Sequence, residues 1–198
     1  MSDAPGVLAE SRTGLRTAAK SVRKTAAARH GFLAGRSVAM TGLDFASVPF
    51  GATIGCFSPR LDEFDPLALV LKLDADDFPL ALPVVQGDGR PLLYRSWKPG
   101  DTLKANGFGV KEPLDTALPA EPRCILVPLL AFDSAGYRLG MGGGSYARTI
   151  AALRSKNKKL IVIGIAFDEQ KIDHVPHEDG DQRLDWLLTP SGAKKCRT

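Results

Sequence analysis

The sequence predicts an α/β fold in which a mostly parallel sheet carries helices on both faces. Residues 124–132 form a short apolar run that has β-branched residues near its start and little polar alternation. Such a run is typical of a strand buried on both faces, as in a parallel sheet. Residues 160–166 form a second buried strand, and helical segments separate the predicted strands. With 198 residues and no internal repeat, we expect one domain over residues 1–198, with an ordered core at about residues 8–192.

The composition is that of an ordinary globular protein, with 24% charged and 44% hydrophobic residues. No apolar run approaches the ~20 residues that a membrane span needs. The N-terminal stretch lacks the apolar core of a signal peptide, so we expect a cytoplasmic protein without a membrane partner. The cysteines, Cys56, Cys124 and Cys196, are too widely spaced for a zinc pattern or a disulfide framework, which suits a reducing compartment.

The formal net charge of +4 comes mainly from basic residues crowded at the start and the end of the chain. A polyanionic small ligand explains this balance as well as RNA does. Because neither zinc-finger spacing nor an aromatic RNA-binding signature is present, nucleic acid is the weaker alternative and we expect no nucleic-acid partner.

Residues 7–33 are predicted to form the first helix, because apolar residues at 8, 15 and 22 repeat every seven positions. Arg12, Arg16 and Lys20 stand four apart and therefore share another face. A solvated basic face is the common explanation of such a pattern. The alternative is a set of cations that reach the phosphates of a ligand.

The middle and end of the chain alternate between short strands and connections. Pro66 favours a helix start, and the glycines at 87 and 89 favour a hairpin turn. We expect strands at 53–57, 78–85, 91–97, 160–166 and 184–189, a helix from Pro66 to about 73, a long connection at 99–122, and an end of order at 190–192 before a basic tail.

A cluster of glycines follows the central apolar strand. Arg138 precedes glycines at 140 and 142–144, and residues 146–153 have helical composition. Glycines allow backbone N–H groups to approach an anion, and a helix start adds unpaired donors and a positive dipole end. The pattern therefore predicts a phosphate cradle. It is neither the P-loop pattern nor the dinucleotide fingerprint, which would need glycine at Ser145, so a plain tight connection is the alternative.

The stretch 127–148, VPLLAFDSAGYRLGMGGGSYAR, resembles the signature of the 5-formyltetrahydrofolate cyclo-ligases, VPGLAFD-x-x-G-x-RLG-x-G-x-GYYDR. The resemblance covers about residues 8–192 and implies a three-layer Rossmann-like fold. Further segments match in the expected order: Arg12-x-x-x-Arg16, Asp62 to Asp65, Leu82-Pro83, residues 108–113, residues 164–170 and Val175-Pro176.

The resemblance also implies an activity. This is the cyclisation of 5-formyltetrahydrofolate to 5,10-methenyltetrahydrofolate, with ATP as co-substrate and Mg²⁺, and with release of ADP and phosphate. The formyl oxygen is a poor leaving group, and transfer of the γ-phosphoryl group to it allows N10 to close the ring. Such a transfer needs positioning and charge neutralisation more than covalent help from the protein. We expect a monomer whose partner is the folate.

Site residues follow from the same resemblance. Arg138 is the catalytic cation, Asp181 is the metal contact, and Glu63 offers two acceptors to the donors of the pterin ring. For the ring-contacting aromatic residue, Trp97 ranks above Tyr94. The ATP-binding set is Arg12, Arg16, Arg138, Leu139, Gly140, Met141, Gly142, Gly143, Gly144, Ser145 and Tyr146. The folate-binding set is Glu63, Trp97, Met141, Gly142, Gly143, Gly144 and Ser145.

Three positions depart from the family pattern. Ser145, Ala147 and Gly180 stand where the family usually has Tyr, Asp and His. Three hypotheses therefore stay open: an active cyclo-ligase, a non-catalytic relative that binds folate or nucleotide, and a basic interaction protein built on this fold.

Overall fold

The computed structural model describes residues 5–60, 62–107 and 109–197, and the side chains from residue 11 onward. Phe108 and the side chain of Leu8, both used in the sequence analysis, lie outside this description. The elements along the chain are α1 (Pro5–Thr41), η1 (Asp44–Ala46), β1 (Ile54–Gly55), α2 (Leu67–Ala75), β2 (Leu80–Val84), β3 (Leu93–Ser96), β4 (Leu103–Ala105), β5 (Lys111–Pro113), β6 (Cys124–Pro128), β7 (Ala131–Phe132), β8 (Arg138–Leu139), α3 (Ser145–Lys156), β9 (Ile161–Ile165), η2 (Asp168–Gln170), β10 (Trp186–Thr189) and β11 (Gly192–Lys195).

The main sheet has seven strands in the order β11-β10-β9-β6-β1-β2-β3. Its five central strands pair in parallel, and the two edge strands, β11 and β3, pair antiparallel with their neighbours. The strand pairs β4–β5 and β7–β8 form two small separate sheets. The predicted α/β class with a mostly parallel sheet is confirmed.

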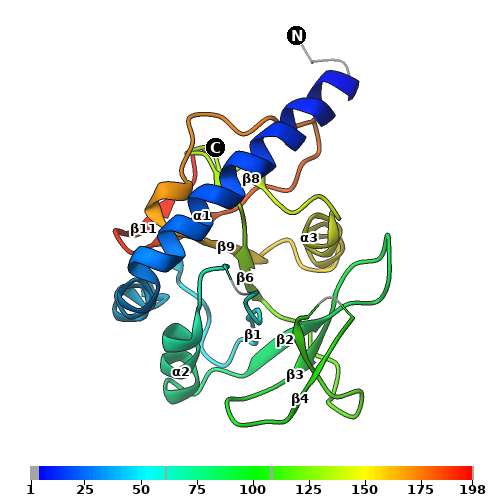
Figure 1. The fold of residues 1–198 in the computed structure, drawn as a ribbon. Coiled ribbons are helices and arrows are strands. Elements are labelled where there is room, and N and C mark those ends of the chain that lie inside the picture. Colours follow the sequence, from blue (N-terminus) through cyan, green and yellow to red (C-terminus); the bar gives the residue numbers. More distant parts are fainter. Residues whose placement is uncertain (1–4, 61, 108, 198) are drawn as a thin grey trace.

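Both faces of the sheet are covered, as β6 shows residue by residue. Cys124 and Leu126 belong to the core cluster that includes residues of α1 and α2. Ile125 and Val127 point the other way, into a cluster that includes Ile150 of α3. Successive side chains of a strand alternate between faces, so a run buried on both sides must be apolar throughout. Figure 1 shows the resulting three layers, with α3 on the face opposite to α1 and α2.

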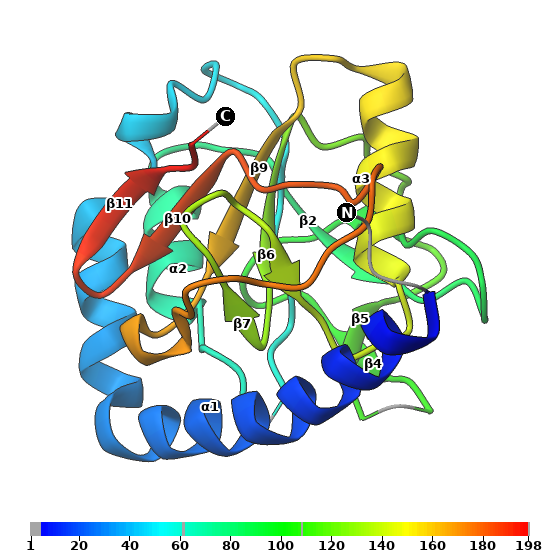
Figure 2. The same ribbon diagram turned by 90° about the horizontal axis from the view of Figure 1, so that it is seen from above.

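The adjacent strands β1 and β6 form a topological switch point. From β1 the chain passes through α2 to β2, which extends the sheet on one side. From β6 it passes through α3 to β9, which extends the sheet on the other side. Ligands of open α/β sheets bind beyond the carboxyl ends of the strands at such a point. In Figure 2, α1 crosses the side of the molecule toward which β6 and β9 run.

Regular structure extends beyond the predicted core, from Pro5 to Lys195. The first helix continues to Thr41 rather than ending near residue 33, and the connection 99–122 contains the β4–β5 hairpin. The predicted basic tail is strand β11, which pairs with β10 across a reversal at Gly192, where φ is +111°. This pairing depends on a partner strand already in place, which the composition of the tail does not reveal. Within the described residues, no helix combines the length and the apolar character needed to cross a membrane.

The three cysteines are free thiols buried in the core. Cys124 is fully buried in β6, as its apolar neighbours suggested. Burial raises the pKa of the Cys56 and Cys196 thiols to about 12 and raises the pKa of Cys124 further. None is a thiolate at neutral pH, so they act as packing residues.

We expect Gly55→Ala to destabilise the fold, because a Cβ at this position of β1 would lie 2.6 Å from the ring of Tyr94 and 2.9 Å from Ile125. Overpacking of a dense core costs about 1–3 kcal/mol. Urea unfolding of both proteins measures the loss. Gly31→Ala in α1, where a Cβ would meet nothing within 4 Å, is the control and should stabilise by about 0.5–1 kcal/mol. Equal stabilities for the two variants would contradict this description of the core.

Candidate active site

A cavity of about 470 Å³ opens at the switch point. The carboxyl ends of three parallel strands form its floor, with Phe57 and Ser58 after β1, Val85 after β2, and Leu129 after β6. Helix α1, the glycine loop and the loop that contains Asp181 form its walls. The cavity therefore lies where an open α/β sheet is expected to bind its ligand.

Helix α1 presents three arginines to the cavity, at positions 12, 16 and 23. At 3.6 residues per turn these positions lie within about 40° of one another around the helix. Arg12 donates through Nε to the carbonyl of Pro176 at 2.9 Å, and it pairs with Asp181 through Nη2. Arg16 donates through Nε to the carbonyl of Gly140, at 3.1 Å. The basic face of the helix is thus turned inward at these positions.

The glycine loop joins β8 to α3 and lines the cavity from Gly140 to Gly144. Gly142 and Gly144 have φ angles of +109° and +68°, which glycine adopts without a steric penalty. No side chain caps the start of α3, so the N–H groups of its first turn can serve an anion. Arg148 braces the loop, because its Nη2 donates to the carbonyl of Gly143 at 2.6 Å and its Nε to that of Arg90 at 3.4 Å.

Arg138 lies in β8 at the beginning of this loop and donates to the backbone carbonyl of Gln182. Burial lowers the pKa of its guanidinium to about 10; Asp181 opposes this shift, whereas Arg154 adds to it. Arg138 therefore keeps its charge at neutral pH. A buried cation with few compensating groups attracts an anion strongly, because its own hydration has been lost.

Glu63 stands at the other end of the cavity, in the loop after β1. Its side chain is only 9% exposed, and its Oε2 accepts from the backbone N–H of Arg60 at 3.0 Å. Its Oε1 lies 3.5 Å from Nη1 of Arg23. Both oxygens thus have a fixed partner, which orients the carboxylate and leaves its remaining lone pairs for donors in the cavity.

The structure brings together all but one of the residues proposed from the sequence. The residues that line the cavity are Arg12, Arg16, Glu63, Arg138, Leu139, Gly140, Met141, Gly142, Gly143, Gly144, Ser145, Tyr146 and Asp181.

Trp97 is the exception, and its placement in the folate site is corrected here. Its backbone N–H bonds to the carbonyl of Leu80, the first residue of β2, because β3 runs antiparallel to β2. Trp97 therefore lies at the amino edge of the parallel strands, opposite to the cavity, and it packs against the core there. Tyr94 is also a core residue, 2% exposed and packed over Gly55.

The described residues contain no group of three or more His, Cys, Asp or Glu side chains that could hold a metal ion. Asp181 is paired with Arg12, and its Oδ2 also accepts from the N–H of Glu178 at 3.0 Å. A magnesium site needs oxygen ligands that are not already committed to cations. The side chains do not fit a metal site held by the protein alone.

Among the cavity residues to which sequence reasoning gave no role are Arg23, Arg148 and Glu112. The helical pattern does predict a cavity position for Arg23, because it lies on the same face of the helix as Arg12 and Arg16, about three turns after Arg12. Glu112 is 4% exposed and accepts from the N–H of Val85 at 3.0 Å. No local pattern reveals it, because its cavity position depends on how the β4–β5 hairpin docks.

The fold and the site define an α/β protein of the class that binds its ligand at the switch point of an open sheet. A model described as the 5-formyltetrahydrofolate cyclo-ligase family matches residues 8–190. The 5-formyltetrahydrofolate cyclo-ligase of Haemophilus influenzae is 31% identical over 180 residues, which cover 88% of this chain and 95% of that protein. That of Escherichia coli K12 is 32% identical over 162 residues, or 79% and 88% of the two chains.

A solved structure gives the same result. The NMR structure of Aquifex aeolicus 5,10-methenyltetrahydrofolate synthetase superposes with a TM-score of 0.73 at 25% identity, covering 94% of this chain and 93% of that one. The chain belongs to the 5-formyltetrahydrofolate cyclo-ligase family of enzymes. The resemblance drawn from the glycine signature is confirmed.

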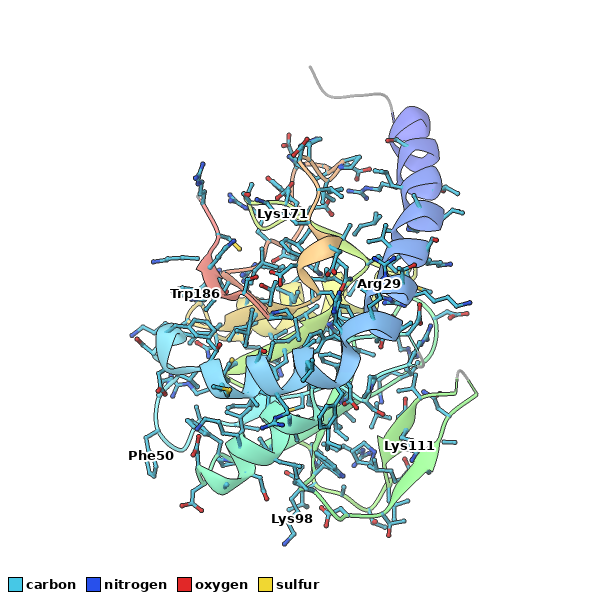
Figure 3. All side chains as sticks on the ribbon, turned by 60° about the vertical axis from the view of Figure 1, so that its left-hand side comes forward. Arg29, Phe50, Lys98, Lys111, Lys171 and Trp186 are labelled. Carbon is cyan, nitrogen blue, oxygen red and sulfur yellow. The ribbon has the colours of Figure 1, made fainter. Side chains whose placement is uncertain are left out.

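We expect Arg16→Met to weaken ATP binding about 10- to 100-fold, because hydrogen bonds to charged groups contribute about 1.5–3 kcal/mol. Isothermal titration with ATP alone measures the dissociation constant. Arg29→Met removes the same charge from an exposed position of the same helix (Figure 3) and is the control. If both variants weaken binding equally, the effect is one of net charge and the cavity position of Arg16 is irrelevant.

Proposed function

We propose that this protein catalyses the ATP-dependent cyclisation of 5-formyltetrahydrofolate to 5,10-methenyltetrahydrofolate, with release of ADP and phosphate. The observation that carries the proposal is the meeting, in one cavity, of a cationic glycine loop and a fixed carboxylate. The first suits a triphosphate and the second suits a pterin. The relatives named cyclo-ligases support the same reaction.

The triphosphate lies at the end formed by the glycine loop. Arg12 and Arg16 from α1 and Arg138 from β8 supply positive charge, and the backbone of residues 140–146 supplies N–H donors. Arg16 already contacts the loop at the Gly140 carbonyl, so its guanidinium lies beside the backbone donors that would face the ligand. Backbone donors and guanidinium groups together neutralise the charge that develops on a transferred phosphoryl group.

The reduced folate lies with its pterin at Glu63. The carboxylate accepts from the amino group and the ring N–H of the aminopyrimidinone, a pairing of two acceptors with two donors. Leu129 and Val85 line the same part of the cavity and exclude water from the flat ring. The glycine loop, whose members Met141 to Ser145 line both parts, places the formyl group next to the terminal phosphate.

In the proposed reaction the formyl oxygen attacks the γ-phosphorus of ATP, and the bond from that phosphorus to the bridging oxygen of ADP breaks. N10 then attacks the formyl carbon and gives up its proton. The carbon–oxygen bond breaks, and the oxygen leaves as part of inorganic phosphate, which takes up that proton, while the ring closes. Arg138 is the catalytic cation, since it contacts the phosphoryl group during transfer and holds its charge at neutral pH.

Magnesium enters the proposal only as the ion that accompanies ATP. No step is assigned to it, because the described side chains form no metal cluster and Asp181 is already paired with Arg12. Mg²⁺ keeps most of its water and binds through substrate phosphates in many enzymes, so phosphate oxygens are sufficient ligands.

A second candidate function is binding of folate or nucleotide without turnover. The pairing of Asp181 with Arg12 favours it, since this ion pair partly neutralises a cation that the proposed reaction assigns to the triphosphate. One assay separates the two. The purified protein is incubated with 5-formyltetrahydrofolate, ATP and Mg²⁺, and methenyl absorbance is followed in the near ultraviolet. ATP-dependent product establishes the enzyme; thermal stabilisation by ligand without product at any Mg²⁺ concentration establishes the binder.

We expect Glu63→Gln to raise KM for 5-formyltetrahydrofolate about 10- to 100-fold, because a charged acceptor of two hydrogen bonds is lost. KM for ATP should stay within about twofold, since Glu63 lies at the opposite end of the cavity. Steady-state kinetics with each substrate varied in turn measures both constants. Glu169→Gln, at a half-exposed carboxylate, is the control. A rise confined to KM for ATP would place the folate elsewhere.

We expect Ala147→Asp to lower the Mg²⁺ concentration that gives half-maximal activity. Ala147 lines the cavity in the first turn of α3, so an aspartate there adds a hard oxygen ligand beside the phosphates. Magnesium titration of initial rates measures the change. Ala151→Asp adds the same charge to an exposed site on this helix and should change nothing. An unchanged requirement in both variants means that residue 147 is remote from the metal.

A further inference from the structure

We propose that Arg23 is a positioning residue for the folate: its buried guanidinium holds the Asp62–Glu63 loop so that the Glu63 carboxylate faces the pterin. The proposal rests on the function proposed above and adds a residue to it. Arg23 is 2% exposed, as deeply buried as Asp133 among the described charged residues, yet it lines the cavity.

The contacts of Arg23 tie three segments together at the switch point. Its Nη2 donates to both oxygens of Asp62 at 3.0 Å, and these hydrogen bonds between charged groups are stronger than neutral ones. Its Nη1 lies 3.5 Å from Oε1 of Glu63 and 3.5 Å from the carbonyl of Leu129, the residue that follows β6. One side chain of α1 therefore spans the exits of β1 and β6.

Stability alone does not explain a cation at this place. The Nε of Arg23 is buried without a hydrogen-bond partner among the described residues, which is a cost. Buried ion pairs are often matched or exceeded in stability by apolar residues of similar volume. Burying Arg23 therefore costs stability without an evident structural gain. Its effect on Glu63 explains it, because Arg23 orients the carboxylate that faces the ligand and stabilises its negative charge.

The Leu129 carbonyl that Arg23 contacts is also held in place by a second side chain. Gln170 is buried and donates through Nε2 to the carbonyl of Leu129 at 2.7 Å and to that of Leu130 at 3.1 Å. The exit of β6 is therefore rigid where Arg23 meets it, and the guanidinium has little freedom to turn. A carboxylate held by such a support keeps its geometry before the ligand arrives, which lowers the cost of binding.

Helix α1 thereby links the two ends of the cavity. Arg12 and Arg23 are eleven residues apart, about 16 Å along the helix axis. The same rigid rod carries the phosphate cations at one end and the support of the folate carboxylate at the other. The spacing between Arg12 and Arg23 is therefore set by helix geometry.

The test uses the full-length protein and measures dissociation constants for 5-formyltetrahydrofolate and for ATP separately, by isothermal titration. Arg23→Lys keeps the charge but loses the planar guanidinium whose two terminal nitrogens contact Asp62, Glu63 and the Leu129 carbonyl, so folate binding should weaken about tenfold while ATP binding changes less than about twofold. Asp62→Asn, at a partly exposed side chain, should act in the same direction. Arg29→Lys, at an exposed position of α1, is the matched control and should match the wild type.

A double-mutant cycle with Glu63→Gln shows whether Arg23 acts through Glu63. In the Glu63→Gln background, Arg23→Lys should weaken folate binding by less than about twofold. If the losses of folate affinity in the two single variants multiply in the double variant, Arg23 does not act through Glu63 and the proposal is overturned. Equal losses of affinity for folate and ATP also overturn it, in favour of a general structural role.

If thermal melting shows Arg23→Lys to be unfolded, Asp62→Asn decides alone, and unchanged folate binding overturns the proposal. A wild type that binds no folate removes the proposed function and this proposal together; a wild type that binds folate, with variants that match it, removes this proposal only.

Discussion

The structure depends on the divergence of β1 and β6, which pair side by side and then lead the chain in opposite directions. Helix α2 returns over one face of the sheet and α3 over the other, so neither connection covers the carboxyl ends between them. The strand ends expose backbone carbonyls and N–H groups that require partners. Helix α1 crosses this opening and supplies arginines to it, and the remaining space is the cavity.

The cavity has two chemically distinct ends, and each is maintained by a different physical device. At the phosphate end, the glycine loop offers backbone donors that need no side-chain reorganisation, and the guanidinium groups around it are partly or fully desolvated. At the folate end, one carboxylate is held by a buried ion-pair network. Helix α1 contributes to both ends, since Arg12 and Arg23 are about 16 Å apart along its axis.

The structure shows the local surroundings of the three positions that depart from the family pattern. Gly180 has a φ angle of +95°, a conformation that a side chain such as His would adopt only with strain. Next to this glycine, the Asp181 carboxylate reaches Arg12 and pairs with it. Ala147 and Ser145 leave the first turn of α3 without an acidic side chain, and Tyr146 is its one aromatic residue.

The sequence by itself determined the parts that depend on local pattern. These are the buried parallel strands, the glycine loop before α3, and the basic face of α1. Each is predicted by residues that are close together in the sequence: an apolar run, glycines that allow positive φ, and a helical period. Only the tertiary structure decided the parts that depend on partners distant in the chain. Pairing with β10 made β11 a strand, and the packing of α1 across the switch point brought Arg23 to Asp62 and Glu63. Pairing at this edge of the sheet and helix docking are set by long-range burial, which a local pattern does not encode.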